Sequence, residues 1–403
     1  MSKFERRFQL IQHTPMIHFQ GDQMGATLRA SELKPKLDEF LKKKIQNKED
    51  YNKWLIPEQE EALNYKVRVL LTKSCENNVT SRTNAPMYFG DTGSKKEFKP
   101  GSTGNKKEIK HLNHAKAPLE VVIFSFYAGL LEEIETYFAE FLFMTNFGTR
   151  QSKGYGSFSF LEMECENFSY PYFEILELVD PKFVKHEGKP RKVDGDKRVA
   201  RREDFVQVMK FISYYHQRLK SGVNFPREFK KSFLYKYQQV KLKSTYTWEK
   251  RWLKEKFIGL PADGTSPKFS RAFLGLSMGY VFFPKFKNKR RGEVYPNKEL
   301  NIKIEHLAAN PELKIARFKS PITFKPVFYQ GKWRVYIIAD SIPELMKNQL
   351  FRFSSDEASA KLATPVEVIK INDLILEFHK HLGSSFTAYD FNLTVGTAKI
   401  FNP

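Results

Sequence analysis

The spacing of hydrophobic and polar residues in the first part of the chain predicts alternating strands and helices. Alternation over residues 4–16 predicts a strand that ends at Thr14-Pro15, and Ser31 is predicted to be the N-cap of a helix with an apolar stripe at every third or fourth position. The elements predicted after this helix are strands at 65–71, 119–126 and 157–165 and a helix at 129–146. Strand, helix, strand, strand, helix, strand is the ferredoxin-like order.

The second part of the chain predicts the same order less regularly. The predicted elements are a strand at 172–178, a charged linker at 182–202, a helix at 205–219, strands at 315–327 and 332–339, a helix at 372–382 and a strand at 386–393. Gln330-Gly331 is expected to form the turn between two of these strands, and Gly383 to stop the last helix. The fold class expected is α+β, with two ferredoxin-like domains in tandem, residues 1–168 and 169–403, and long inserted loops.

Charge indicates the kind of partner. The 403 residues include 67 Lys and Arg against 46 Asp and Glu, a formal net charge of +21. Self-repulsion of this size favours an anionic partner, and nucleic acid is the leading candidate; a charge that serves solubility alone is the alternative.

Cysteine content and hydropathy limit the classes of protein to which the chain can belong. Cys75 and Cys165 are the two cysteines of the sequence, too few for a disulfide framework or a zinc ribbon, so a reducing cytoplasm is expected. No apolar stretch is long enough to span a bilayer and no signal-peptide core is present, so no membrane partner is expected. No cofactor and no metal are predicted.

The segment richest in candidate chemistry is the glycine-rich basic loop 146–157, between a predicted helix and a predicted strand. Gly148, Gly154 and Gly156 are expected to let the backbone approach a ligand, while Arg150 and Lys153 supply charge for phosphates and Tyr155 stacks on a base. An ordinary flexible turn is the alternative. The loop lacks GKS or GKT and follows a helix, so it is not a P-loop.

Further basic residues extend the predicted RNA interface. On the first helix these are Lys34 and Lys36. In the long insertion before residue 119 the predicted contacts are Lys95, Lys96, Lys106, Lys107 and Arg82. Each of these can equally be part of a solvated loop or a simple turn. Polar composition predicts disorder in the insertion, with ordering on a phosphate backbone.

These motifs resemble the RAMP superfamily of CRISPR proteins. The loop 146–157 is similar to the family's glycine-rich loop, Thr14-Pro15-Met16 to its strand end, and Gly25–Leu37, which contains Arg29, to its entry into the first helix. Residues 318–322 are similar to a strand segment that recurs in the family. In the second half the corresponding loop is reduced to 274–279, without basic residues, and is expected to be a packed turn.

Two such halves resemble subunit one of the type III-B Cmr effector module. The resemblance implies an RNA-binding, non-catalytic subunit in antiviral defence. It also implies guide crRNA and target RNA as partners, held near the 3′ part of the guide, together with other Cmr-type subunits. Specificity is then expected from base pairing, with the protein reading phosphate and shape.

Two other functions remain open from the residues. A metal-independent CRISPR RNA-processing endoribonuclease would use His13 or His18, but the sequence offers no partner constellation. His111 and His114 have metal-like spacing without a third ligand nearby, and the loop acids Asp91, Asp194 and Asp196 show no organised pairing. No catalytic residue is therefore predicted. The second alternative is a protein-binding scaffold, in which the 15% aromatic residues serve subunit interfaces.

Overall fold

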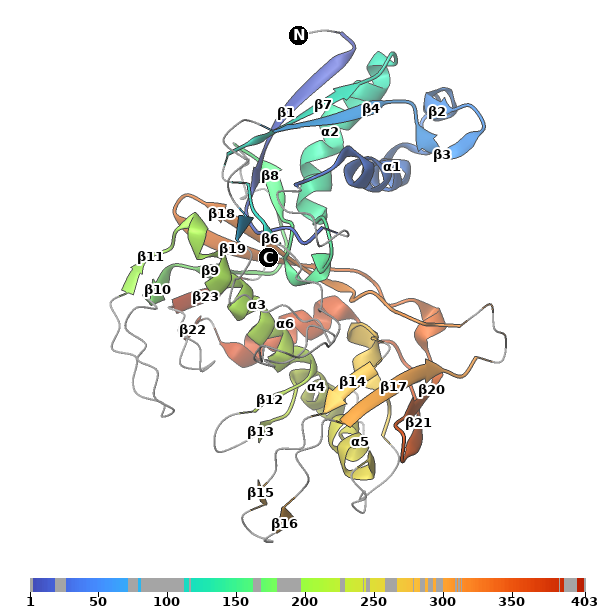
Figure 1. Ribbon diagram of the computed structural model, residues 1–403, viewed down its shortest axis with the longest axis vertical. Helices are drawn as coiled ribbons and strands as arrows, with labels where there is room; N and C mark the ends of the chain where they lie inside the picture. The colour runs from blue at the N-terminus through green and yellow to red at the C-terminus, as the bar shows by residue number, and fades with distance from the viewer. Residues whose placement is uncertain are drawn as a thin grey trace, which may run out of the picture.

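The structure is a computed structural model of the whole chain. It describes residues 3–18, 27–71, 79–80, 112–115, 117–161, 168–179, 197–224, 229–241, 243, 247–257, 267–277, 279–282, 287–288, 293–294, 300–308, 310, 312, 314–383, 385–387 and 397–401. The protein is of mixed α and β structure, with antiparallel sheets and several helices in two halves (Figure 1).

The first half is a four-stranded antiparallel sheet of order β4-β7-β1-β8 with two helices. Its main elements are β1 (Glu5–Gln12), α1 (Ala30–Ile45), β4 (Lys66–Leu71), β7 (Leu119–Phe124), α2 (Ala128–Met144) and β8 (Phe158–Phe160). Short elements are η1 (Tyr51–Trp54), β2 (Leu55–Ile56), β3 (Gln59–Leu63), β5 (Val79–Thr80) and β6 (Leu112–Asn113).

The two helices of this half bury their apolar stripes against the same face of the sheet. Leu33, Leu37 and Leu41 of α1 are fully buried, as the spacing of the stripe requires. On β1, the ring of Phe8 lies 4.6 Å from that of Phe138 in α2. These contacts make one core for the first half.

The second half contains a five-stranded antiparallel sheet of order β18-β19-β9-β23-β22. Its elements are β9 (Tyr172–Ile175), α3 (Phe205–Lys220), β18 (Ile322–Tyr329), β19 (Lys332–Ala339), α6 (Ile371–Leu382), β22 (Ser385–Thr387) and β23 (Thr397–Phe401). Tyr215 of α3 packs on Phe173 of β9 and on Phe378 of α6, so both helices share the core of this sheet.

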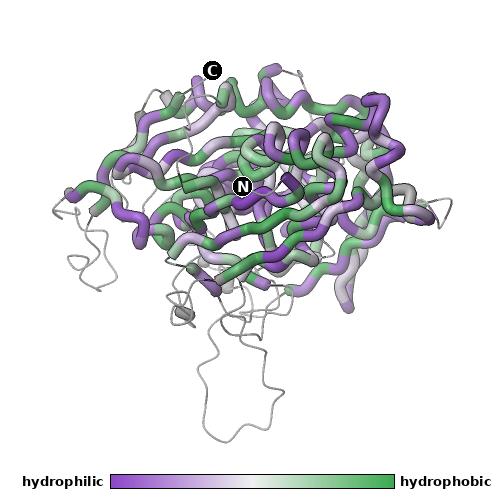
Figure 2. The backbone as a smooth tube through the Cα atoms, turned by 90° about the horizontal axis from the view of Figure 1, so that it is seen from above, coloured by the Kyte–Doolittle hydropathy of each residue, from purple (hydrophilic) through white to green (hydrophobic). Residues whose placement is uncertain are grey.

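Another four-stranded sheet, of order β14-β17-β20-β21, belongs to this half. It is made of β14 (Gly279–Phe282), β17 (Leu300–His306), β20 (Leu350–Ser354) and β21 (Ser359–Ala363), and it lies beside α4 (Phe233–Lys241) and α5 (Glu249–Phe257). Short elements of the half are β10 (Glu177–Val179), β11 (Lys197–Val199), η6 (Arg202–Asp204), β12 (Val223–Asn224), β13 (Phe229–Lys230), η7 (Ser270–Leu274), β15 (Lys287–Asn288), β16 (Glu293–Val294) and η9 (Glu344–Met346). Figure 2 shows short hydrophobic and hydrophilic stretches that alternate along the described chain.

Several predicted boundaries are wrong. Helix α1 begins at Ala30 with Arg29 at the N-cap, and Ser31 lies inside it, exposed. The strand predicted from 315 begins at Ile322, and β8 ends at Phe160, five residues early. Of the strand predicted at 386–393, residues 386 and 387 lie in β22 and residues 388–393 lie outside the described residues. The unpredicted β23 pairs with β9. Within the predicted linker, residues 197–199 and 202–204 form β11 and η6, while 182–196 lie outside the described residues.

Other elements follow the prediction closely. The helices at 128–144, 205–220 and 371–382 and the strand at 332–339 lie within two residues of the predicted ranges, which is the usual uncertainty of helix ends. The predicted turn has positive φ at both Gln330 (48°) and Gly331 (74°), as a two-residue hairpin requires.

Buried polar groups join the two halves. Lys325 of β18 is 0% exposed and its ammonium donates to the carbonyls of Leu142 (2.6 Å), Thr145 (2.9 Å) and Phe158 (2.8 Å) in the first half. It thereby places a positive charge at the negative C-terminal end of α2. Arg202 donates from the second half to the carbonyl of Gln12. Because these donors satisfy carbonyls that packing removes from water, they fix how the halves sit together.

Candidate nucleic-acid interface

The glycine-rich loop links α2 to β8 and folds back on itself. Asn146 and Ser157 form a bridge at its base, and the N–H of Phe147 donates to the carbonyl of Gly156 at 2.9 Å. A short 3₁₀ turn, η3 (Gln151–Lys153), forms its tip. Positive φ angles occur at Gly148, Arg150, Gly154 and Gly156, so the backbone turns sharply four times within the loop.

The glycines of the loop make room for the protein's own atoms. A Cβ on Gly156 would lie 1.9 Å from the carbonyl oxygen of Phe147, and one on Gly148 would lie 2.5 Å from that of Ile17. At Gly154 a Cβ would lie 3.0–3.1 Å from Pro326 and Ile212 of the second half. The predicted role of these glycines was close approach of a ligand. In this structure the space that a Cβ would take is filled by protein, and approach of a ligand to the backbone of these glycines stays a prediction.

The predicted Thr14-Pro15 strand end forms the support of the loop. The hydroxyl of Thr14 donates to the carbonyl of Gly154 at 2.6 Å and accepts the N–H of Ser157 at 3.0 Å. The carbonyl of Pro15 accepts the N–H of Gly156 at 2.9 Å. Two motifs that are more than a hundred residues apart in sequence are therefore one structural unit.

Tyr155, which the sequence predicts to stack on a base, is buried in the protein. Its side chain is 0% exposed and belongs to the core of the second half. A ring buried in this way offers no face to a base in this conformation, and base stacking by Tyr155 stays a prediction that this arrangement does not favour. Its aromatic surface instead stabilises the contact between the loop and the second half.

The two cations of the loop lie at the boundary between the halves, and both are half-buried. Burial, with the positive charges of Lys220 and Arg150 as smaller causes, lowers the pKa of Lys153 well below its usual value. Lys220 ends α3 and its ammonium donates to the carbonyls of Leu274 (3.0 Å) and Gly275 (2.6 Å). Three basic side chains from the two halves therefore lie close enough to repel one another. Binding of a phosphate beside them would offset this repulsion.

The predicted cations of α1 are engaged with protein groups. Lys34 donates to Asp38 (2.7 Å) and to the carbonyl of Leu63 (2.9 Å), and Lys36 donates to the carbonyl of Asn146 at 2.9 Å. Burial, partly offset by Glu32, lowers the pKa of Lys36. Arg29 is half-buried at the N-terminus of α1, and its charge, after burial, lowers the pKa of His18. Lys36 therefore ties α1 to the start of the loop.

Five of the predicted RNA-binding residues lie outside the described residues: Arg82, Lys95, Lys96, Lys106 and Lys107. For all of the predicted contacts, binding of RNA stays a prediction. The sequence pattern did not indicate Lys220, His216 or Lys325. His216 and Lys220 have four-residue spacing on α3, a signal that a helical projection of residues 205–220 would have shown. Lys325 alternates with apolar residues in a strand and gave no such signal.

The histidine considered for catalysis is a buried structural group. Nδ1 of His13 accepts the N–H of Phe328 at 3.1 Å, and Nε2 lies 2.8 Å from the hydroxyl of Ser159. Nε2 therefore carries the proton and the ring is neutral. Burial, followed by the charges of Lys325 and Arg202, holds the pKa of His13 well below its usual value. Among the described residues, no group of three or more His, Cys, Asp and Glu is placed to hold a metal ion.

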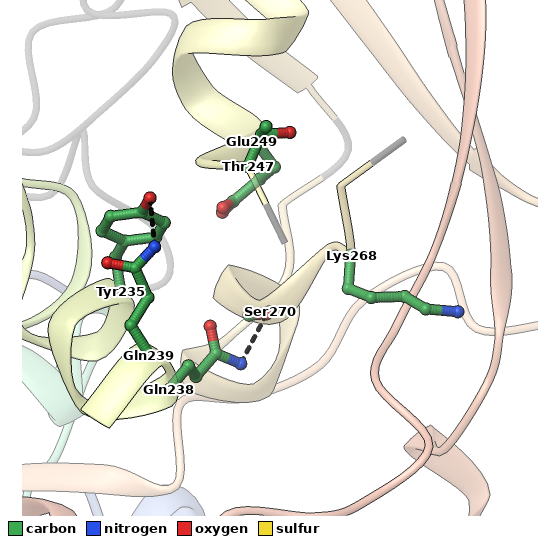
Figure 3. Close-up of a pocket in the computed structure, with 7 residues that line it drawn as sticks. All are labelled: Tyr235, Gln238, Gln239, Thr247, Glu249, Lys268 and Ser270. Carbon is green, nitrogen blue, oxygen red and sulfur yellow. Dashed lines mark hydrogen bonds between the residues drawn. The ribbon is translucent and has the colours of Figure 1, made fainter. Parts of the chain in front are cut away.

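One enclosed pocket lies in the second half, beside α4 and η7. Figure 3 shows the residues that line it: Tyr235, Gln238, Gln239, Thr247, Glu249, Lys268 and Ser270. Gln238 donates to the hydroxyl of Ser270 at 2.7 Å, and the cavity measures about 10 Å³. That is room for about one water molecule, so the pocket is too small for a nucleotide.

No helix in the described part of the chain is both long enough and apolar enough to cross a bilayer.

Comparison with known proteins shows to which class of proteins the chain belongs. Residues 2–223 match the Cmr1 N-terminal domain and residues 229–399 match the Cmr1 C-terminal domain. The matches cover almost the whole chain and define a RAMP superfamily protein of CRISPR systems, as the motifs indicated. The chain belongs to the Cmr1 family. The family domains meet between residues 223 and 229, whereas the sequence pattern predicted a boundary at 168.

The other comparisons add little. A chain of a type III-B Cmr-beta complex, solved by cryo-EM with cognate target RNA bound, is similar with a TM-score of 0.28 and 16% identity. The similarity covers 40% of the present chain and 60% of that chain. None of the curated proteins compared with the chain matches it.

Proposed function

We propose that this chain is an RNA-binding, non-catalytic subunit of a type III-B CRISPR effector complex. It holds guide crRNA and target RNA near the 3′ part of the guide and contacts other Cmr-type subunits. Membership of the Cmr1 family supports the place in the complex. The observation that carries RNA binding is the meeting of Arg150 and Lys153 with Lys220 where the two halves adjoin, in a chain of net charge +21.

We also propose that both halves are ferredoxin-like. In the first half the order β1-α1-β4-β7-α2-β8 gives the sheet order β4-β7-β1-β8. In the second half β9-α3-β18-β19-α6-β23 gives β18-β19-β9-β23, in which each strand has the same place. The sheet β14-β17-β20-β21 is then an insertion into the second half, and the edge strand β22 an addition to it.

The state of the histidines supports the proposed non-catalytic role. General acid–base cleavage of RNA needs a group that gains and loses a proton beside the substrate. Both ring nitrogens of His13 are engaged with protein groups, and the ring is 1% exposed. His18 is 6% exposed, and burial lowers its pKa. Neither ring is open to a ribose hydroxyl in this arrangement, so processing of guide RNA is the weaker proposal.

Binding of another protein is a second candidate function, and a separate observation favours it. Phe126 is 75% exposed just beyond the end of β7, and its ring contacts those of Phe4 and Phe124 at centroid distances of 6.1 and 5.0 Å. An exposed aromatic group of this kind is typical of the centre of a protein interface. It suits contact with a neighbouring subunit and is compatible with RNA binding elsewhere on the chain.

The test is binding of a labelled guide RNA by the full chain over a salt series. We expect affinity to fall steeply with salt because neutralised phosphates release counterions. The variant Arg150→Ala/Lys153→Ala should bind more weakly with a shallower salt dependence. The matched control Lys43→Ala/Lys53→Ala removes the same charge from exposed ion pairs with Glu39 and Asp50 and should bind as the unmodified chain does.

Other results would change the proposal. Cleavage of the guide RNA without metal, lost in His13→Ala or His18→Ala, would support the endoribonuclease. Absence of binding at low salt would leave protein contact as the function of the chain. Equal weakening by both double variants would assign binding to net charge alone.

A further inference from the structure

Helix α3 carries a stripe of three side chains, one apolar and two basic, that runs away from the glycine-rich loop. Ile212, His216 and Lys220 follow one another at four-residue spacing, so they lie on one face, one turn apart. The first of them packs on the loop, since a Cβ on Gly154 would lie 3.1 Å from Cδ1 of Ile212. Lys153 precedes that glycine. The stripe therefore begins at the loop of the first half and ends at Lys220.

Hydrogen-bonding capacity remains unused along this stripe. Nε2 of His216 is buried and has no hydrogen-bond partner within the described part of the chain, and the residue is 9% exposed. The ammonium of Lys220 has three N–H groups and directs two bonds at the carbonyls of Leu274 and Gly275. Lys153 makes no side-chain hydrogen bond to any residue that the structure describes. A buried ring nitrogen without a partner is costly, which points to a group that is missing here.

The surrounding charges are mainly positive. The loop contributes Arg150, α3 contributes Lys220, and η7 contributes Arg271. The acidic group beside them, Glu249 of α5, is already bonded to Arg271 at 2.7 Å, with both side chains buried. Lys250, next to Glu249, adds a further cation and donates to the carbonyl of Ser221 at 3.0 Å.

Burial and this field lower the pKa values of two of these groups. Burial and then the charge of Arg271, opposed by Glu249, lower the pKa of Lys220 to about 7. Burial, with Lys153 and Lys220 as smaller causes, holds the pKa of His216 well below its usual value. An anion beside these groups would reverse both effects, because it attracts the charged forms.

We propose that Lys153, His216 and Lys220 form one phosphate site between the two halves, which receives a backbone phosphate of the bound RNA and takes up protons from solvent as it does so. The inference rests on the RNA-binding function proposed above and adds the second half to the interface. A phosphodiester offers only acceptors and carries no exchangeable proton at neutral pH. Neutral imidazole therefore becomes imidazolium by taking a proton from water or buffer, and the new N–H bonds to the phosphate oxygen.

The test is calorimetric titration of a single-stranded guide RNA into the full chain at pH 7.5, in two buffers of different ionisation enthalpy. The expected result is a buffer-dependent heat that corresponds to net uptake of roughly one to two protons for each RNA bound. His216→Gln should lower this uptake, and Lys220→Met should weaken binding about tenfold, as expected for loss of one charge-assisted bond. Lys241→Met removes an exposed lysine of α4 and serves as the charge-matched control.

The outcomes separate this site from RNA binding in general. If the unmodified chain binds RNA with no proton uptake and His216→Gln and Lys220→Met bind as it does, the composite site is wrong and RNA binding stands. If the unmodified chain fails to bind RNA at low salt, the proposed function itself fails. His216→Gln breaks no hydrogen bond within the described residues, so it remains informative even if loss of the Lys220 bonds to η7 unfolds the other variant.

Discussion

The ammonium of Lys325, on β18 of the second half, lies 2.6 Å from the carbonyl oxygen of Leu142, in the last turn of α2 of the first half. The last carbonyls of a helix lack their usual partners four residues on. Here the carbonyl of Leu142 accepts the N–H of Thr145 at 3.4 Å, and a side chain from the other half supplies a second, shorter bond. The glycine-rich loop begins just after this turn. The geometry of the loop therefore depends on the second half being in place.

Replacement of Lys325 tests this dependence. Lys325→Met should lower the free energy of unfolding by roughly 2–4 kcal/mol, because the carbonyls of Leu142, Thr145 and Phe158 lose their donor while remaining buried. Urea denaturation measures the change. Lys332→Met, at an exposed position on β19 with a 3.4 Å ion pair to Glu174, should cost less than about 1 kcal/mol. Equal losses in the two variants would refute the proposed role of Lys325.

Substitution of the loop glycines separates backbone strain from crowding. Gly156→Ala should destabilise the protein by more than about 3 kcal/mol, since positive φ is combined with a Cβ position 1.9 Å from a carbonyl oxygen. Gly331→Ala is the matched control: it has φ of +74° in the hairpin turn and the nearest atom to its Cβ position lies 4.0 Å away, so it should cost only about 1–2 kcal/mol. Thermal unfolding of both variants provides the comparison, and similar values would contradict the crowding at Gly156.

The tyrosine of the loop should act through the core. Tyr155→Phe should leave guide RNA affinity unchanged, whereas Tyr155→Ala should reduce stability by about 3–5 kcal/mol by leaving a cavity. Affinity measured by fluorescence anisotropy, beside denaturation curves, checks both. Weaker RNA binding by a fully folded Tyr155→Ala protein would restore the base-stacking role that the sequence suggested.

The buried histidine should make the protein sensitive to acid. Since the pKa of folded His13 lies below the unfolded value of about 6.5, the unfolded chain binds more protons between these two values. The free energy of unfolding should therefore fall as the pH drops below about 6.5, by up to about 1.4 kcal/mol per pH unit for each such group. His13→Gln should show a shallower fall in urea titrations between pH 7 and 5. An unchanged slope would exclude His13 as a cause.

The ion pair between Glu249 and Arg271 gives a further prediction. Both side chains are buried, so Glu249→Gln leaves a guanidinium without its counter-charge and should cost about 3–5 kcal/mol. A double variant, Glu249→Gln/Arg271→Met, should recover part of this loss, because no unpaired charge then stays inside. Chemical denaturation of the single and double variants tests the coupling, and a double variant no more stable than Glu249→Gln would refute it.

The sequence by itself determined the elements that periodicity specifies. The stripe of Leu33, Leu37 and Leu41 predicted α1, and the breaker pair Thr14-Pro15 marked the end of β1, because spacing and turn chemistry are local properties. It also carried the motifs of the family, since residue type in a short segment is enough to show them.

Tertiary structure decided what each residue of the candidate site does. Tyr155 entered a core because Phe173 and other residues far along the chain enclose it, and Lys325 became a donor to α2 because the halves meet at β18. The pairing of β23 with β9 joins residues more than two hundred apart. Whether a lysine faces solvent, a carbonyl or another cation depends on contacts distant in sequence. Only the folded chain could therefore show that Lys153, His216 and Lys220 belong together.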